Sequence, residues 1–359
     1  MPNPVLNFFD TYTLVAISRE IAPVPSFFRD RYFPTAPEDI FDSDKVLTEC
    51  QKGDHRMAPF VTPRIGDIPV DRTGYEIYEY QPAFIAPSRL LTIDDLRKRG
   101  FGESMYPGST PAERAARLQL KDMTDLDKKI TRREEWMSVQ TMINNACEMQ
   151  EYVDSQTKGA RNYIAFYDKD ANEHKYTVSK KWDSAEGNII GDVKAMCRLL
   201  QQRGLPAADL VLGSSAAEAV LSKSELRELL NKNLAYDFGS IENDIVYPGV
   251  VRMGTLNFGG FRLTLWDVSE TYEDDSGNTT LYFPANSAMV TAPACGHMMY
   301  GRITQIDYGS ENHTDYAAKR VPKFSVNQEK DIRKMRLAAR PLAAPKDYCP
   351  WIYAAEVCE

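Results

Sequence analysis

Residues 110–137 read TPAERAARLQLKDMTDLDKKITRREEWM, and they predict the start of a long helix. Thr110 and Glu113 match a capping box, with Pro111 at the first helical position. Apolar side chains then recur every three or four residues on one helical face: Ala116, Leu120, Met123, Leu126 and Ile130. The pattern resumes after Glu135, so we predict one helix over about 110–151. About 40 residues at ~1.5 Å each give a rod of roughly 60 Å, which is longer than a small domain is wide.

A charged block interrupts this pattern at Arg132, Arg133, Glu134 and Glu135. Neighbouring residues on a helix point to different sides, so the two glutamates do not form a carboxylate pair. Exposed ion pairs contribute little to stability. We therefore interpret the block as part of a solvated face and assign it no catalytic role.

Residues 46–95 predict an extended hairpin in place of a helix. Prolines at positions 59, 63, 69, 82 and 87 exclude a helix, and 75–80 is rich in β-prone residues. An isolated two-stranded hairpin is marginal in water, and this one has little apolar content of its own. We expect a partner subunit to support it.

Residues 1–45 predict an arm that prolines divide into short pieces. Four aromatic side chains fall within seven positions: Phe27, Phe28, Tyr32 and Phe33. Such a cluster must be buried, and two alternatives remain open. It packs into the local core, or it docks on a neighbouring subunit.

Residues 188–303 alternate between helix and strand and predict a compact α/β domain. The expected helices span 189–202 and 215–231, and the expected strands span 209–213, 260–267 and 279–284. Residues 160–182 predict a β-rich insertion. After residue 303 the chain predicts strand and loop, with a possible helix at 329–336.

Composition excludes several classes of protein. The 359 residues are 43% hydrophobic, which suffices for a core, and the net charge of −8 argues against a nucleic-acid-binding face. None of the six cysteines forms a CxxC pair, so we expect reduced thiols. We expect no signal peptide, and no apolar window approaches the ~20 residues that span a membrane.

Signatures of catalysis are weak. Gly213 and Ser214 follow a predicted strand, as a nucleophile elbow would, but the second glycine is missing and Ser215 is better interpreted as a helix N-cap. Cys295 and His297 lie close together without an acidic partner, so we expect structural roles for them. We predict no enzyme and assign no catalytic, cofactor-binding or metal-binding residue.

Several segments, taken in their order along the chain, resemble the lambda-type major capsid proteins of tailed phages, the major capsid protein E family. The segments that carry the resemblance are 27–34, 58–63, 80–87, 132–137, 281–284 and 300–301. The resemblance implies an α+β chain with the Hong Kong 97-type phage capsid fold. It implies this division of the chain: an N-terminal arm at 1–45, an extended loop at 46–95, a peripheral domain with the spine helix at 96–187 and 300–340, and an axial domain at 188–299 and 341–359.

The resemblance also implies what the chain does. Such proteins assemble with copies of themselves, as pentamers and hexamers, into the icosahedral shell that encloses packaged phage DNA in the virion. Portal, scaffold and decoration proteins are further expected partners, DNA lies nearby without specific binding, no membrane is involved, and assembly takes place in the host cytoplasm. We keep two alternatives, an encapsulin-like shell that holds protein cargo and a cytosolic α/β enzyme.

We expect contacts between subunits from the arm aromatics, the hairpin tip and the charged block of the helix. These residues are Phe27, Phe28, Tyr32, Phe33, Ile65, Asp67, Ile68, Val70, Arg72, Arg132, Arg133, Glu134 and Glu135.

Overall fold

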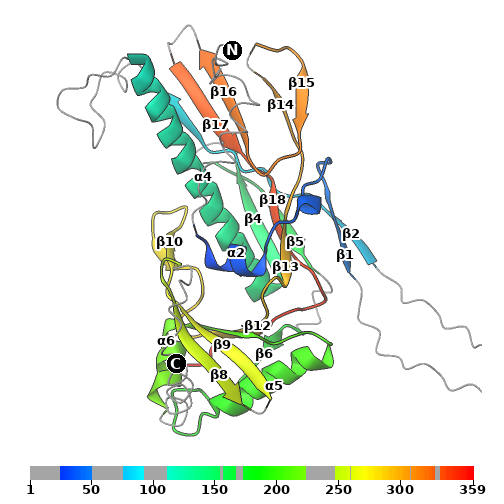
Figure 1. The fold of residues 1–359 in the computed structure, drawn as a ribbon, viewed down its shortest axis with the longest axis vertical. Coiled ribbons are helices and arrows are strands. Elements are labelled where there is room, and N and C mark those ends of the chain that lie inside the picture. Colours follow the sequence, from blue (N-terminus) through cyan, green and yellow to red (C-terminus); the bar gives the residue numbers. More distant parts are fainter. Residues whose placement is uncertain are drawn as a thin grey trace, which may run out of the picture.

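Helix α4 (Pro111–Asn144) crosses the upper half of the molecule and organises the sheets beside it (Figure 1). The computed structural model describes residues 25–50, 76–92, 111–153, 157–166, 173–223, 247–258, 260–307, 309–327 and 332–359. The 34 residues of α4 make a rod of about 50 Å at ~1.5 Å per residue. The long helix is confirmed, whereas Thr110 of the predicted capping box lies outside the described residues.

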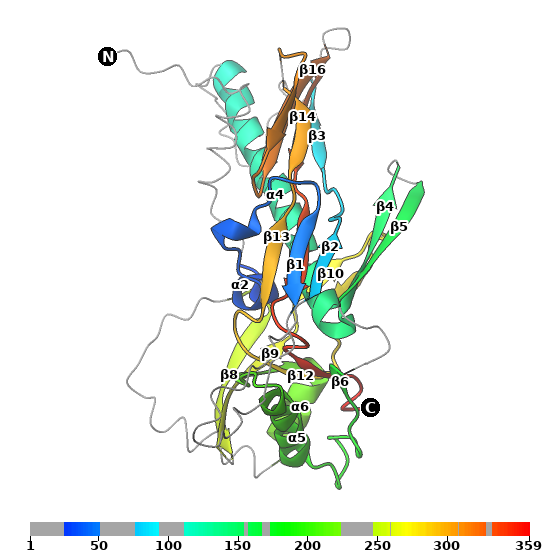
Figure 2. The same ribbon diagram turned by 90° about the vertical axis from the view of Figure 1, so that its right-hand side faces the viewer.

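The predicted helix end at 151 is wrong. Asn145 has a φ of 51°, in the left-handed region that ends helices, and its side-chain amide donates to the carbonyl of Phe166 at 2.6 Å. Strand β4 (Ala146–Tyr152) follows and pairs antiparallel with β5 (Lys158–Ala165). Figure 2 shows this hairpin standing away from the other sheets.

One face of α4 packs on sheet. A three-stranded antiparallel sheet has the order β16 (Val321–Asn327), β17 (Ile332–Ala338) and β3 (Ser88–Leu91). The possible helix at 329–336 is therefore wrong from residue 332 onward. Residues alternate along β17, and Met335 and Leu337 are buried in clusters with side chains of α4.

Further two-stranded sheets surround this layer. Strand β13 (Gly296–Tyr300) pairs with β18 (Pro341–Pro345), β14 (Ile303–Ile306) with β15 (His313–Tyr316), and β10 (Thr271–Glu273) with β11 (Thr279–Leu281). Strand β1 (Val46–Cys50) pairs antiparallel with β2 (Glu76–Tyr80), which confirms the pairing at the base of the predicted hairpin. Its tip lies outside the described residues.

The lower half of the molecule is a six-stranded mixed sheet with two helices (Figure 1). Its strand order is β6 (Lys175–Tyr176), β19 (Ile352–Ala354), β12 (Ala288–Thr291), β7 (Asp209–Gly213), β9 (Phe261–Val268) and β8 (Val250–Phe258). Helices α5 (Ile189–Gln202) and α6 (Ser214–Ser222) pack on this sheet. The predictions for α5 and β7 are confirmed to the residue.

Helix α6 begins one residue before the prediction, and Ser215 is not its N-cap. Gly213 occupies that position. A Cβ at Gly213 would lie 2.2 Å from the carbonyl oxygen of Pro284, so only glycine fits this close approach. The predicted continuation of the helix to residue 231 lies outside the described residues.

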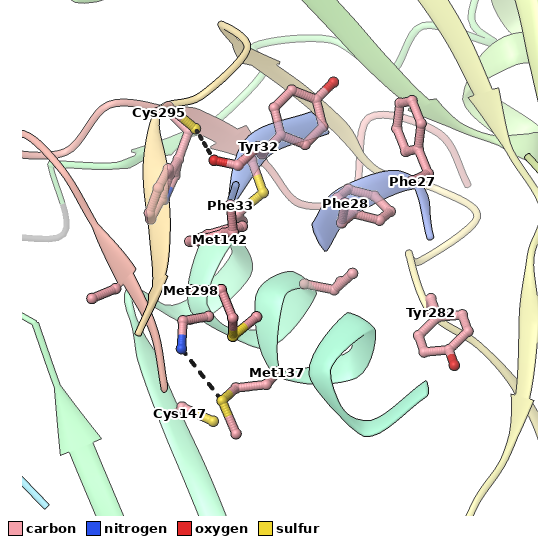
Figure 3. Packing of buried hydrophobic residues seen from close by; sticks show 14 of the residues in the cluster. Phe27, Phe28, Tyr32, Phe33, Met137, Met142, Cys147, Tyr282, Cys295 and Met298 are labelled. Atoms are coloured by element: carbon pink, nitrogen blue, oxygen red, sulfur yellow. Dashed lines mark hydrogen bonds between the residues drawn. The ribbon is translucent and has the colours of Figure 1, made fainter. Parts of the chain in front are cut away.

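The hydrophobic core has two main clusters. One lies between the arm, α4, β4, β5, β13, β18 and one face of the six-stranded sheet, and Figure 3 shows part of it around Phe28, Phe33, Met137, Met142 and Met298. The other lies between α5, α6 and the six-stranded sheet. No helix in the part of the chain that the structure describes is long and apolar enough to cross a membrane.

Candidate functional site

The aromatic cluster of the arm is buried inside its own subunit. Helix α2 (Phe27–Tyr32) carries three of the four rings, and all four, Phe33 included, are fully buried. Phe27 packs edge-on against Phe28 with centroids 5.2 Å apart and lies 5.1 Å from the ring of Trp266. The structure thus shows the local-packing alternative. A role for these rings between subunits stays a prediction.

The charged block of α4 is only half solvated, and its interpretation as a solvated face is wrong for Glu134 and Glu135. Both glutamates are buried, whereas Arg132 and Arg133 are exposed. The reason is that two other segments cover this part of the helix. They are the arm, which precedes α4 in the chain, and the loop before β16, which follows it.

Glu134 is the centre of a buried ion-pair network. Arg320 grips it with two guanidinium nitrogens, Nη1 at 2.6 Å from Oε1 and Nη2 at 2.9 Å from Oε2. The hydroxyl of Tyr300 donates to Oε1 at 3.0 Å, and Arg29 donates to Oε2 at 3.3 Å. Burial alone would raise the pKa of Glu134, but Arg320 and Arg29 outweigh it and lower the pKa. Such bidentate pairs are among the strong hydrogen bonds of proteins.

Arg320 also reaches a second carboxylate of α4, about two helical turns before Glu134. Its Nε donates to Asp127 at 2.6 Å. The Arg320 side chain is only 11% exposed, and the two carboxylates accept hydrogen bonds from its Nε and its two Nη atoms. The network fastens the loop before β16 to the middle of α4.

Glu135 holds the arm. Its two carboxylate oxygens accept the backbone N–H groups of Phe28 and Arg29 at 2.7 and 2.8 Å. Burial, with a smaller contribution from the nearby Glu270, raises the pKa of Glu135 to about 8 against the lowering effect of these two bonds. The neighbouring glutamates therefore bind different partners, as their positions on the helix require.

A pH dependence follows from Glu135. Its folded-state pKa lies above its ordinary value, so the folded state keeps a proton that the unfolded state releases. Stability should therefore fall as pH rises from about 5 to about 8. In Glu135→Gln we expect a shallower fall, with the remaining slope due to Glu270, whose pKa burial raises to about 7. Thermal unfolding of unassembled subunits across this range measures both slopes. Equal slopes would show that Glu135 is ionised throughout.

Asp209 anchors the other end of α2. The guanidinium of Arg31 donates to it through Nε at 2.6 Å and Nη2 at 2.9 Å, and the hydroxyl of Tyr32 donates at 3.1 Å. Asp209 is the first residue of β7, in the middle of the six-stranded sheet. Helix α2 thus joins α4 to this sheet.

Sequence reasoning missed six members of this junction as site residues. They are Arg29, Arg31, Asp127, Asp209, Tyr300 and Arg320. The only local signal was Asp209, a carboxylate at the start of a strand with fully buried character. A charge in such a position is buried only with a partner, so it should have predicted an arginine.

The remaining predicted contact residues divide into two groups. Arg133 forms an exposed ion pair with Asp275 at 2.7 Å, and Tyr152 donates to the same carboxylate at 3.1 Å. The carbonyl of Arg132 accepts the hydroxyl of Tyr282 at 3.3 Å. The second group comprises Ile65, Asp67, Ile68, Val70 and Arg72, which lie outside the described residues.

Cys295 and His297 were the weak candidates for catalysis in the sequence, and their contacts fit structural roles. Cys295 is buried, and burial raises the pKa of its thiol to about 12, whereas the thiolate is the reactive form. The imidazole Nδ1 of His297 lies 3.4 Å from Asp39. Across the described residues, no group of three or more His, Cys, Asp or Glu side chains could hold a metal ion.

Comparison with known proteins gives one family. The model of the phage major capsid protein E family matches residues 10–355. A search of curated proteins found no match.

Three similar solved structures are capsid or phage-related proteins. A prophage capsid protein of E. coli CFT073 aligns with a TM-score of 0.66 at 16% identity, over 96% of this chain and 98% of that one. A phage-related protein of Bordetella bronchiseptica RB50 aligns with 0.53 at 12% identity, over 96% of each chain. The capsid protein of Ralstonia phage GP4 aligns with 0.51 at 11% identity, over 93% of this chain and 91% of that one. These likenesses confirm the α+β, Hong Kong 97-type capsid fold.

Proposed function

Because the chain belongs to the phage major capsid protein E family and is a capsid shell protein of the virion, we propose that its pentamers and hexamers close into the icosahedral head of a tailed phage. The observation that carries this function is the family match over residues 10–355. It covers the arm, α4 and the six-stranded sheet in one alignment. Neither the encapsulin-like alternative nor the enzyme alternative is favoured by this match, and we propose a structural role without catalysis.

The division into domains is part of the proposal. The arm would be 1–45, the extended loop 46–95, the peripheral domain 96–187 with 300–340, and the axial domain 188–299 with 341–359. The second core cluster, between α5, α6 and the six-stranded sheet, supports a separate axial unit. Of its C-terminal part, β19 lies in that sheet, while β18 pairs with β13 beside α4.

We further propose that the β1–β2 ribbon contributes to contacts between copies. Leu47 is 50% exposed and Ile77 is 55% exposed, and both lie on the same face of the ribbon because Leu47 opposes Glu79, two residues from Ile77. Two large aliphatic side chains on one exposed face favour contact with another protein. Ile65, Asp67, Ile68, Val70 and Arg72, which follow β1 in the chain, and the exposed Arg132 and Arg133 are the other proposed contact residues.

The wider setting is proposed on the same basis. Portal, scaffold and decoration proteins would contact the shell, and assembly would take place in the host cytoplasm. Packaged DNA would lie nearby without specific binding, since the net charge of −8 offers little release of counterions.

Purified chains should assemble into rings or closed shells. Sedimentation over a wide range of concentration, followed by electron microscopy of the fast-sedimenting fraction, measures this. A folded protein that stays monomeric at every concentration, with and without a co-expressed scaffold, contradicts the proposed function.

A further inference from the structure

We propose that the face of the β16–β17–β3 sheet that points away from α4 binds an acidic surface of a second copy of this chain. This inference rests on the proposed function, because it names one surface through which copies associate. We call it the cationic face and define it by Lys323, Lys334 and Arg336.

The alternation of side chains decides which residues belong to this face. Phe324 and Met335 are buried in a cluster with Met123 of α4, so they point toward the helix. Arg89 of β3 opposes Met335 and forms ion pairs with α4 at Asp122 and Asp125, which places it on the same side. Their neighbours along the strands must point the other way. These neighbours are Lys323, Lys334, Arg336 and Leu90.

Two of the cations face each other. Lys323 and Arg336 are direct partners in the antiparallel register of β16 and β17. Like charges in this position destabilise a sheet. Burial lowers the pKa of Lys323, and the charge of Arg336 lowers it further. The fold therefore maintains an unfavourable pair that an external carboxylate would relieve.

No carboxylate in the described part of the chain forms an ion pair with these cations. Within that part, Arg336 donates only to the neutral Gln305, at 3.0 Å, while its Nε is buried without a partner. Asp307 is the carboxylate that acts on Lys323. Its two oxygens already accept bonds from Gln305 at 3.1 Å and Tyr316 at 2.6 Å.

Apolar side chains border the cations and favour a protein over DNA. Leu90, opposite Lys334, is 58% exposed, and Phe84, whose ring lies 5.6 Å from the guanidinium of Arg336, is 47% exposed. Three cations beside an exposed leucine and phenylalanine fit a protein surface that carries both carboxylates and apolar groups. A DNA duplex instead presents a continuous row of phosphates. Every copy carries a net charge of −8, so a neighbouring copy offers the complementary charge.

Chemical labelling of amines in the full-length protein tests this proposal. Lys323 and Lys334 should be labelled at least about fivefold more slowly in shells than in unassembled subunits. A carbodiimide, which joins amines to carboxylates, should link one of them to an aspartate or glutamate of another copy. Shells assembled from a mixture of isotope-labelled and unlabelled subunits show by mass spectrometry whether a link joins two copies.

Each outcome of this experiment either supports or overturns the proposal. Protection together with a link between copies supports the proposal. Equal labelling in shells and subunits, links within one copy only, or protection that appears only in DNA-filled shells overturns it. Since wild-type shells must form before labelling starts, failure of the proposed function is seen first and separately.

A charge reversal gives a second test. Lys334 is exposed, so Lys334→Glu should leave the melting temperature of the subunit within about 2 °C of wild type, while the concentration needed for assembly at low salt should rise about tenfold. The matched control is Lys128→Glu, an exposed lysine on α4, for which we expect at most a twofold change, about 0.4 kcal/mol. Equal thresholds for the two variants contradict a contact at the cationic face.

Discussion

Leu126→Asp is expected to abolish shells and to remove most folded subunit as well. Leu126 is buried on α4 against Ile130, Leu337 and Ala339. A carboxylate in this position has no partner, and its burial costs several kcal/mol. That is a large share of the ~5–15 kcal/mol that keeps a typical protein folded. Soluble yield and the shell peak of a sucrose gradient measure the effect.

Lys128→Glu is the control for this substitution on the same helix. Lys128 is exposed and lies two residues from Leu126, about 200° around the helix at ~3.6 residues per turn. We expect a change in stability below ~1 kcal/mol and normal shells. Normal assembly of Leu126→Asp together with failure of Lys128→Glu would mean that the lattice, and not the core, uses the charged side of α4.

Arg320→Met is expected to destabilise the subunit by about 3–5 kcal/mol. The substitution keeps much of the side-chain volume but leaves Glu134 buried without its main cationic partner and removes the bond to Asp127. Removal of one member of a buried ion pair typically has an effect of this size. The melting temperature should fall by roughly 5–15 °C in calorimetry of unassembled subunits.

Two further variants make the prediction for Arg320 specific. The double variant Arg320→Met with Glu134→Gln should recover part of the loss, because the buried negative charge is then gone. Arg133→Met breaks the exposed pair with Asp275 and the contact of the guanidinium with the Trp136 ring, and it should change stability by about 1 kcal/mol or less. If Arg133→Met lost as much stability as Arg320→Met, the charges that stabilise α4 would lie on its exposed side.

Local signals predicted much of the fold. The bounds of α5 follow from apolar residues that recur with the helical period of ~3.6, and those of β7 follow from a short run of apolar residues that is typical of a buried strand. The buried face of α4 was predicted for Met123, Leu126 and Ile130, although Leu120 on the same face is exposed. The end of α4 was missed because a single left-handed asparagine, Asn145, decides it.

The junction could not be predicted because its partners are distant in the chain. Glu134 binds Arg29 and Arg320, which lie 105 and 186 positions away. Nothing in a charged block tells which of its members later segments will cover. Strand β17 was missed for a similar reason, since its buried residues alternate with basic ones and only the sheet separates the two sides.

Helix α2 fixes the angle between α4 and the six-stranded sheet. One end of this short helix is tied to α4 through Glu135 and the other to β7 through Asp209, so the arm is a brace between the two halves of the subunit. A rotation of the six-stranded sheet against α4 must stretch the hydrogen bonds at one of these two ends. The tilt between the halves is thereby a property of each subunit before any neighbour arrives. In a shell built from many copies, this internal tilt would add to the angle between neighbouring subunits, and the side chains that hold it are Glu135 and Asp209.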